Sequence, residues 1–442
     1  MSVSTTMIQS DSVSATTPRR PAPTPSAGGA LRHQPAAVWA VAFACVVSFM
    51  GIGLVDPILP SIASKLHATQ TQSELLFTTY LAMTGVAMFF TSFVSSRLGI
   101  KRTLLIGLGL VIVFASACAA SPGVSDIIGF RAGWGVGNAL FVSTALAAMV
   151  SAATGGSAGA IILYETALGI GMAVGPLTGG LLGSISWRVP FVGTATLMLL
   201  GLIAIAAMLK SGAGAQAKRA PVAKTPLSAS FRALKDPGMG TMGAAAFFYN
   251  MAFFTTLAFP PFALARLGVT DAITIGLVFF GWGALLAVSA VGIAPRLTRA
   301  LPRTTVLIIA EVALAVVLLA CALFINQLMP LIVAVILAGI PLGLLNTVLT
   351  ECSMEASVLP RPVASATYSG CRFLGGAIAP PLTTILAAHI TVWAPFVYGA
   401  AMILVSCFII VARRATLWRA DLTEESAEEE AESMGLAAAS LN

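Results

Sequence analysis

Long apolar runs alternate with short polar or basic breaks along the chain, from about residue 36 to about residue 412. Each run can cross a bilayer as a helix, for which about 20 apolar residues suffice. The pattern therefore predicts an all-α integral membrane protein. We predict twelve spans, at residues 36–63, 74–96, 102–121, 125–151, 158–184, 189–209, 239–265, 271–295, 304–326, 329–352, 363–388 and 392–412.

The chain is predicted to contain two similar halves. Pro176-Leu-Thr178 recurs as Pro381-Leu-Thr383, and Pro190-Phe191 recurs as Pro395-Phe396, both at an offset of 205 residues. A shared offset at two places indicates a duplicated unit of six helices. We expect two pseudo-symmetric six-helix bundles, at residues 36–209 and 239–412. Three polar segments are expected outside them, namely a disordered N-terminal arm at 1–35, a basic linker at 210–238 and an acidic tail at 413–442.

Composition and charge placement support a membrane location. The chain is 57% hydrophobic and 9% charged, whereas soluble domains average about 25% charged residues. With an even number of spans both termini share one side, and nineteen of the 24 Lys and Arg residues fall on that side, against three on the other. The positive-inside rule then makes that side cytoplasmic. We predict a multi-pass protein of the cytoplasmic (inner) membrane with both termini cytoplasmic, and no nucleic-acid partner despite the basic pI.

The sequence lacks the common signatures of catalysis. Its six cysteines are scattered singly, without a CxxC or Cys/His ligand spacing, and no GxxxxGK[ST] phosphate loop occurs. We therefore expect no enzyme activity, no metal and no cofactor. The expected partners are a small-molecule substrate, protons and the lipid bilayer, with the protein acting as a monomer.

The fifth run carries the most specific motif. Gly171, Gly175, Gly179 and Gly183 recur every fourth residue, which predicts a smooth helix face against which another backbone can lie closely. Pro176 is expected to kink the helix beside that face. Simple helix packing is the alternative interpretation of any one glycine.

The whole string resembles the antiporter signature G-x-x-x-G-P-x-x-G-G of the drug:proton antiporters in the major facilitator superfamily. Gly171, Gly175, Pro176, Gly179 and Gly180 match it. The resemblance implies the twelve-helix major facilitator fold and a proton-coupled antiporter that exports drugs, dyes or siderophore-like metabolites by alternating access.

Two other functions stay open at this point. The first is a proton-coupled symporter that imports a small metabolite, against which the antiporter string argues. The second is a non-transporting membrane receptor or scaffold. Intramembrane charges argue against a scaffold, because such charges are costly and a scaffold has no use for them.

Three charged residues within the spans are candidates for proton coupling. Asp56 lies in a string that resembles the first-helix motif of the same antiporters, with Pro60 four residues later. Arg131 begins a string that resembles their fourth-helix motif R-x-x-q-G, with Trp134 in place of glutamine, and the resemblance links this arginine to proton coupling. Glu165 shares a helix stripe with Pro176 and is a further proton or cation site.

Asp56 and Arg131 are predicted to act together. Both lie at a similar depth, about 9–12 Å from the same surface at the helical rise, and the resemblance places their helices on one cavity. We predict that Asp56 carries the proton and that Arg131, always charged, drives its release. The alternatives are that Asp56 satisfies backbone groups freed by Pro57 and Pro60 and that Arg131 snorkels to the surface.

Several further residues are candidates for a site or a structural contact. Arg97, Gly99, Lys101 and Arg102 approximate the superfamily's motif between the second and third helices, although Ser96 stands where an aspartate is expected.

In span seven, Tyr249, Asn250 and Phe253 would suit a bulky, partly apolar solute if their face lines the cavity; packing or lipid contact is the alternative. Glu351 and Arg372 are predicted to form a structural ion pair. Glu311 is the weakest proton-site candidate, because the resemblance makes its helix peripheral.

Overall fold

The computed structural model describes residues 34–154, 158–209, 225–357 and 359–421. Within this part of the chain the structure is helical and contains no strand. It contains 12 helical stretches that are long and apolar enough to cross a membrane. The predicted fold class, an all-α membrane protein of twelve spans, is confirmed.

The first six spans form one bundle. In chain order its helices are α2 (Ala36–Gly53), α3 (Leu59–Lys65), α4 (Gln70–Leu98), α5 (Ile100–Ala120), α6 (Val124–Ala152), α7 (Ala158–Ile185) and α8 (Val189–Met208). The second six spans form the other bundle, with helices α10 (Pro237–Ala258), α11 (Pro260–Arg266), α12 (Ala272–Val288), α13 (Ala294–Ala300), α14 (Arg303–Leu323), α15 (Leu328–Leu337), α16 (Gly339–Glu355), α17 (Arg361–His389) and α18 (Ala394–Ala412). A short helix, α9 (Ala229–Ala233), lies in the connection between them.

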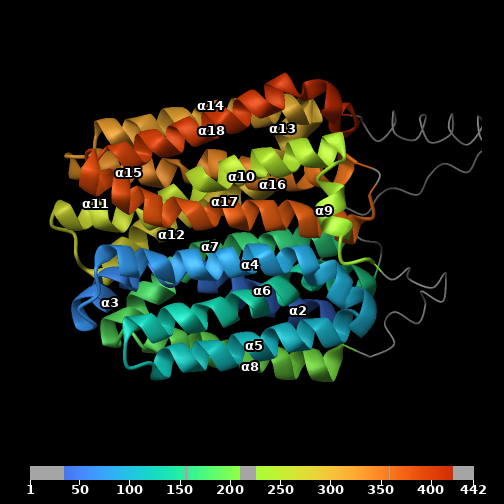
Figure 1. The fold of residues 1–442 in the computed structure, drawn as a ribbon, viewed down its shortest axis with the longest axis horizontal. Helices are drawn as coiled ribbons and strands as arrows, with labels where there is room; N and C mark the ends of the chain where they lie inside the picture. Colours follow the sequence, from blue (N-terminus) through green and yellow to red (C-terminus); the bar gives the residue numbers. More distant parts are fainter. Residues whose placement is uncertain (1–33, 155–157, 210–224, 358, 422–442) are drawn as a thin grey trace, which may run out of the picture.

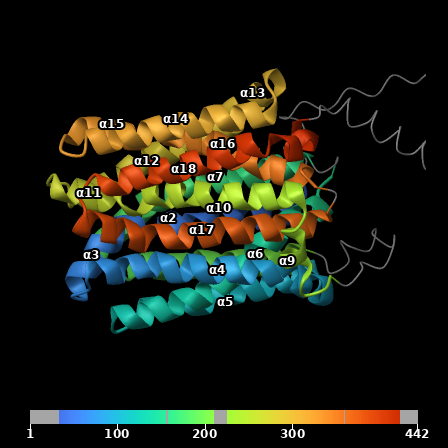
Figure 2. The same ribbon diagram turned by 45° about the horizontal axis from the view of Figure 1, so that its top comes forward.

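The two bundles lie side by side with their helices roughly parallel to one long axis (Figures 1 and 2). Within each bundle the first span packs on the fifth, as α2 on α7 and α10 on α17. Between the bundles, α7 packs on α12 and α4 packs on α17. The helices α7 and α17 therefore each contact both halves of the molecule, and they border the space between the halves.

The first span of each half is broken by proline. The prediction of one continuous span at 36–63 is wrong in detail, because α2 ends at Gly53 and a 3₁₀ turn, η1 (Asp56–Ile58), precedes α3. Pro57 cannot donate the backbone hydrogen bond that would continue the helix. In the second half, α10 ends at Ala258 and α11 begins at Pro260 for the same reason.

Two other spans of the second half are also interrupted. Span eight continues from α12 through a π-helical turn, η3 (Ser289–Ile293), into α13, and span ten changes from α15 to α16 at Ala338.

Both ends of the described chain lie at one end of the molecule. The Gln34 side chain, just before α2, hydrogen-bonds the backbone of Thr154, just after α6. The last described segment, η4 (Arg414–Asp421), packs on α14 and α16, and Asp421 accepts hydrogen bonds from the Thr304 backbone and hydroxyl. This end also holds α9, as Figure 1 shows at the right. We call it the α9 end.

Candidate functional site

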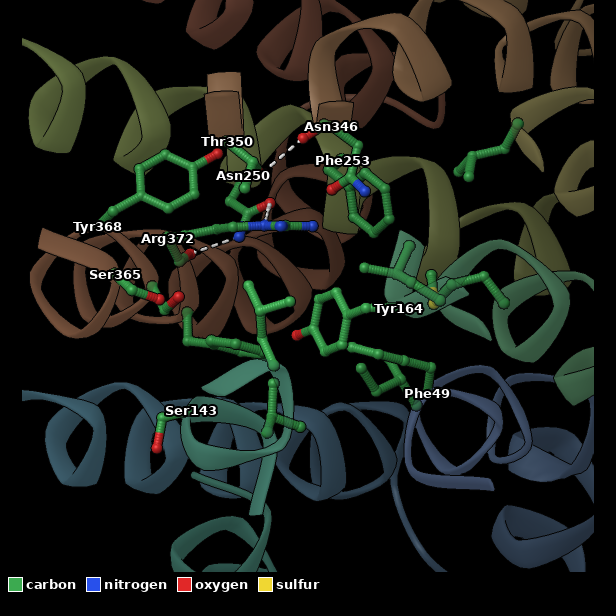
Figure 3. A pocket seen from close by; sticks show the side chains of 18 of the residues that line it. Phe49, Ser143, Tyr164, Asn250, Phe253, Asn346, Thr350, Ser365, Tyr368 and Arg372 are labelled. Atoms are coloured by element: carbon green, nitrogen blue, oxygen red, sulfur yellow. Dashed lines mark hydrogen bonds between the residues drawn. The ribbon is translucent and has the colours of Figure 1, made fainter. Parts of the chain in front are cut away.

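A cavity lies between the two bundles (Figure 3). The first bundle contributes an almost wholly apolar wall from α2, α6 and α7, namely Phe49, Ile52, Val142, Ser143, Leu146, Tyr164, Leu168 and Met172. The second bundle contributes a wall with many polar groups from α10, α12, α16 and α17, namely Asn250, Phe253, Phe254, Leu286, Asn346, Thr350, Met354, Ser365, Tyr368, Ser369, Arg372 and Phe373. The two walls thus differ in chemistry.

The cavity is displaced toward the α9 end of the molecule. Its lining includes Leu146 near the end of α6, Tyr164 near the start of α7 and Met354 near the end of α16, all of which belong to the α9 end. The cavity volume is about 90 Å³, below the roughly 300–1,000 Å³ of pockets that hold drug-sized ligands. A ligand of that size therefore needs the two walls to move apart.

Arg372 and Asn250 form the polar centre of the cavity. The Asn250 Nδ2 group donates to the Arg372 carbonyl oxygen at 2.6 Å, and Arg372 Nε donates to Asn250 Oδ1 at 3.4 Å. These bonds join α10 to α17. Figure 3 shows the Arg372 side chain extending from α17 toward Phe253, with Tyr164 and Phe49 of the first bundle on the opposite side.

The glycines of α7 lie directly against the backbone of α2. A Cβ added at Gly171 would lie 2.6 Å from the Val46 carbonyl oxygen, and one at Gly175 would lie 2.6 Å from the Met50 carbonyl oxygen. A Cβ at Gly179 would meet the Leu54 carbonyl in the same way. Real Cβ atoms do not approach so closely, so only glycine permits this spacing of the two helices.

The other face of α7 lies against α12 of the second bundle. A Cβ at Gly180 would collide with the Ala272 carbonyl, and one at Gly276 of α12 would lie 2.9 Å from the Pro176 carbonyl oxygen. The Pro176 ring also lies against Gly53 of α2. The five residues of the string at 171–180 thus contact two helices, one in each half.

Arg131 is fully buried within the first bundle. Its Nε donates to the Leu76 carbonyl oxygen at 3.2 Å, and its guanidinium carbon lies 4.3 Å from the Tyr80 ring centroid and 4.8 Å from that of Trp134. The side chain does not reach a surface, so the snorkelling alternative is wrong. Trp134, which replaces the glutamine of the resembled motif, contacts the arginine through its aromatic face, a favourable cation–π arrangement.

The side chains of Asp56 and Glu165 lie outside what the structure describes. The backbone of Asp56 begins η1, which packs against α7 and α12. The backbone of Glu165 lies in α7, one residue after Tyr164 of the cavity wall. The pairing of Asp56 with Arg131 stays a prediction.

The remaining predicted residues fall in different places. Asn250 and Phe253 line the cavity, whereas Tyr249 is buried beside α16 and is not among the lining residues.

The predicted motif between the second and third spans, residues 97–102, is called the loop motif below. It lies at the α9 end and makes contacts within its own bundle. Arg97 lies over the Phe93 ring, and Lys101 donates to the Ala206 carbonyl oxygen at 3.1 Å.

Two further residues of the loop motif have simple local environments. Gly99 takes a φ of 81° between α4 and α5, which favours glycine, and Arg102 is exposed. Ser96, in the aspartate position, accepts a hydrogen bond from the Thr225 backbone.

The predicted pair of Glu351 with Arg372 is wrong. Glu351 instead lies 3.7 Å from Arg303 at the α9 end, and Arg303 also pairs with Glu355 at 2.6 Å. Glu351 lies four residues before the end of α16 and Arg372 lies eleven residues after the start of α17, so the two residues differ in depth as well as in direction. Arg372 faces the cavity, whereas Glu351 faces α14.

Sequence reasoning missed most of the polar wall. Asn346, Thr350 and Met354 recur every fourth residue on α16, and Ser365, Ser369 and Arg372 recur at a spacing of four and three on α17. Polar side chains at helical spacing inside apolar runs were the signal that could have revealed this wall.

Comparison with known proteins identifies the family. Residues 41–360 match the model of the Major Facilitator Superfamily. The chain belongs to this superfamily. It is also 46% identical over 387 residues to the multidrug efflux protein YfmO of Bacillus subtilis (strain 168), covering 88% of this chain and 95% of that protein. A more distant relative is the tetracenomycin C resistance and export protein of Streptomyces glaucescens, 30% identical over 45% of this chain and 36% of that protein.

Solved structures of the superfamily share the fold. The human organic anion transporter MFSD10 (TETRAN) matches with a TM-score of 0.67 at 16% identity, over 85% of this chain and 99% of that chain. A D-xylose-proton symporter matches with a TM-score of 0.69 at 14% identity, over 85% of this chain and 96% of that chain. These likenesses extend to the fold alone. The protein is thus a multi-pass membrane protein of a transporter superfamily.

Proposed function

We propose that the protein is a proton-coupled antiporter that exports small amphipathic compounds across the cytoplasmic membrane by alternating access. The observation that carries the proposal is the position of the antiporter string. Its glycines bring α7 into backbone contact with α2 of one half and α12 of the other. The cavity borders the same helix. The long likeness to a multidrug efflux protein supports an exporter over the importing symporter.

The proposed orientation places the α9 end in the cytoplasm. The connection at 210–238, both termini and most Lys and Arg residues are assigned to that side. The cavity then faces the cytoplasm, from which an exporter takes its substrate. A single cysteine at Ser228 in a cysteine-free chain tests the orientation. An impermeant maleimide should label it in inside-out vesicles and not in intact cells, and labelling in intact cells would reverse the proposed direction.

For proton coupling we propose Asp56 as the carrier, Arg131 as the fixed charge that drives release, and Glu165 as the next candidate. Asp56 begins the turn where α2 is broken, beside α7 and α12. A conformational change at the α7–α12 contact therefore acts directly on the environment of this residue. Arg131 is buried on α6, which also packs on α2.

The test is dye uptake into inside-out vesicles driven by an imposed proton gradient, with anionic, neutral and cationic dyes. The wild type should take up at least one class of dye, and Asp56→Asn should abolish gradient-driven uptake while dye binding to the purified protein persists. Asp126→Asn, which removes an exposed carboxylate from α6, is the matched control. If no dye is taken up by the wild type, the export proposal fails. If Asp56→Asn pumps normally, Glu165→Gln is examined in the same assay.

A further inference from the structure

We propose that the cavity binds amphipathic organic anions, with the anionic group on Arg372 and the apolar body against the wall of the first bundle. This inference rests on the proposed function, for which it names a substrate class. It concerns binding, so it can be tested without transport.

The charge of the described cavity lining is positive. Among the described residues that line it, Arg372 is the one with an Asp, Glu, Lys or Arg side chain. Its Nε donates to Asn250 Oδ1, which leaves the four N–H groups on Nη1 and Nη2 without a protein acceptor among the described residues. A guanidinium keeps its charge at any ordinary pH and presents these donors in a planar fork that fits a carboxylate or sulfonate.

The position of Arg372 along α17 strengthens its attraction for an anion. The residue lies eleven positions after Arg361, where α17 begins, or about 16 Å along the helix at 1.5 Å per residue. Arg372 therefore lies well inside a 29-residue helix that is long and apolar enough to cross the membrane. Arg372 is only partly exposed, and a partly buried cation attracts an anion more strongly than it would at a surface.

Asn250 fixes the direction of the guanidinium. Its Oδ1 accepts a hydrogen bond from Arg372 Nε, and its Nδ2 donates one to the Arg372 backbone carbonyl oxygen. The amide of Asn250 on α10 therefore contacts both the side chain and the backbone of Arg372 on α17. The free edge of the guanidinium is directed into the cavity (Figure 3). Asn346 adds a buried Oδ1 without a hydrogen-bond partner among the described residues, which suits a hydroxyl beside the anionic group.

The opposite wall suits an apolar body. Phe49, Ile52, Leu146 and Met172 come from three helices of the first bundle, and Phe253 continues this surface on the second bundle. Aromatic and thioether side chains adapt to flat ring systems of varied shape. A ligand that spans the cavity from Arg372 to Phe49 therefore has one charged and one apolar end.

The experiment uses two dyes with the same xanthene core and opposite charge, fluorescein and rhodamine 123. Binding of each dye to the full-length protein in lipid nanodiscs is measured by fluorescence anisotropy at pH 8, with empty nanodiscs as background. We expect the wild type to bind fluorescein at least tenfold more tightly than rhodamine 123. Arg372→Gln should remove this preference, and Arg372→Lys, which keeps the charge, should retain most of it.

Arg299→Gln is the matched control, because it removes one positive charge from an exposed position on α13 and should leave both affinities unchanged. Equal affinity of the wild type for the two dyes, tighter binding of rhodamine 123, or no saturable binding of fluorescein would overturn the proposal. So would an equal loss of both dyes in Arg372→Gln with Arg372→Lys unable to restore the preference. If the wild type binds fluorescein but a proton gradient drives the uptake of no dye, the export proposal fails and the anion site stands.

Discussion

The two faces of α7 are both built on glycine, but the glycines are distributed differently. On the face toward α2, a row of four glycines belongs to α7, at Gly171, Gly175, Gly179 and Gly183, and each meets α2 or the turn after it one helical turn further along, while α2 adds Gly53 against the Pro176 ring. On the face toward α12, the glycines alternate between the two helices, with Gly180 on α7 and Gly276 and Gly283 on α12.

This difference separates a fixed contact from a changing one. A row of glycines with one repeated spacing fixes a single register of α7 against α2, within one bundle. The α12 face joins the two bundles, and an added Cβ would lie 2.4 Å from the opposite helix both at Gly180 and at Gly283. Alternating access requires that this contact opens, because a rigid contact between the halves would leave the cavity open to one side only. We therefore expect α2 and α7 to move together and α12 to separate from them.

The largest effect is expected at the α2 face. Gly175→Leu places a branched side chain against the backbone of Met50, so α2 must move away along its length. The cost exceeds the ~1–3 kcal/mol of ordinary overpacking, because a backbone cannot rotate aside as a side chain does. We expect a protein that inserts but has a lowered Tm and no dye uptake. Gly109→Leu is the control, since a side chain there meets open space; normal uptake by Gly175→Leu would show that the close α2 contact is dispensable.

The next largest effect is expected from a reversible cross-link on the α12 face. In a cysteine-free chain, Leu177→Cys with Gly276→Cys places two thiols where the Cβ of residue 276 would lie 3.3 Å from the Cα of residue 177. Oxidation should stop dye uptake, because the halves can no longer separate, and a reductant should return uptake to that of the same variant before oxidation, which is the reference because a Cβ at residue 276 already lies close to the Pro176 carbonyl oxygen. The control pair is Ala44→Cys with Gly201→Cys on α2 and α8, which joins helices of one bundle and should leave uptake unchanged. Full uptake by the oxidised 177–276 pair would refute the proposed separation.

A smaller effect is expected where the α12 face is looser. At Gly169, an added Cβ would lie 3.0 Å from the Ala287 Cβ and 3.3 Å from its Cα. A shift of a few tenths of an ångström accommodates a methyl group at that distance. We expect Gly169→Ala to lower the rate of dye uptake by less than about threefold, with Tm changed little. A loss of dye uptake as severe as that of Gly175→Leu would mean that the α12 face of α7 accepts an added side chain no better than the α2 face.

The smallest effect is expected at the start of α12. Hydrogen bonds from the Thr274 hydroxyl and backbone hold the pKa of Asp271 below its usual 3.8. A carboxyl group whose pKa is lowered on folding stabilises the fold above its unfolded pKa and loses this contribution as the pH falls through the folded value. Asp271→Asn should therefore lower the Tm slightly at neutral pH, and the difference from wild type should vanish at a pH well below 3.8. A difference that persists there would exclude the charge as its cause.

The fold was largely predictable because each span carries its own signal. The length of each apolar run predicts a span, and the basic residues between the runs predict which ends of the spans lie on the cytoplasmic side. The breaks inside spans were harder to place. Pro57 and Pro260 end helices, whereas Pro176 and Pro381 lie within α7 and α17. A proline in a membrane helix either breaks or merely bends it, depending on whether neighbouring helices satisfy the freed backbone groups.

The candidate site was predictable only in part. The helix α10 is buried on most of its faces from Gly238 to Ala258, so the period of its apolar residues does not reveal which face lines the cavity. Asn250 and Tyr249 are adjacent, yet one lines the cavity and the other packs against α16. The partner of Arg372 likewise depended on helix rotation, a property that hydrophobic spacing does not encode.

The hydrogen bonds between Asp421 and Thr304 of α14 affect the order in which the protein is assembled. The carboxylate that caps Thr304 lies 117 residues later in the chain, after the final span. During synthesis α14 enters the membrane long before this carboxylate has been made. The α9 end of the second bundle is therefore completed only after the ribosome has translated past α18, when Asp421 and the Ala420 carbonyl reach Thr304 and Arg303. A chain truncated at Arg413 would insert all its spans and still lack this last closing step.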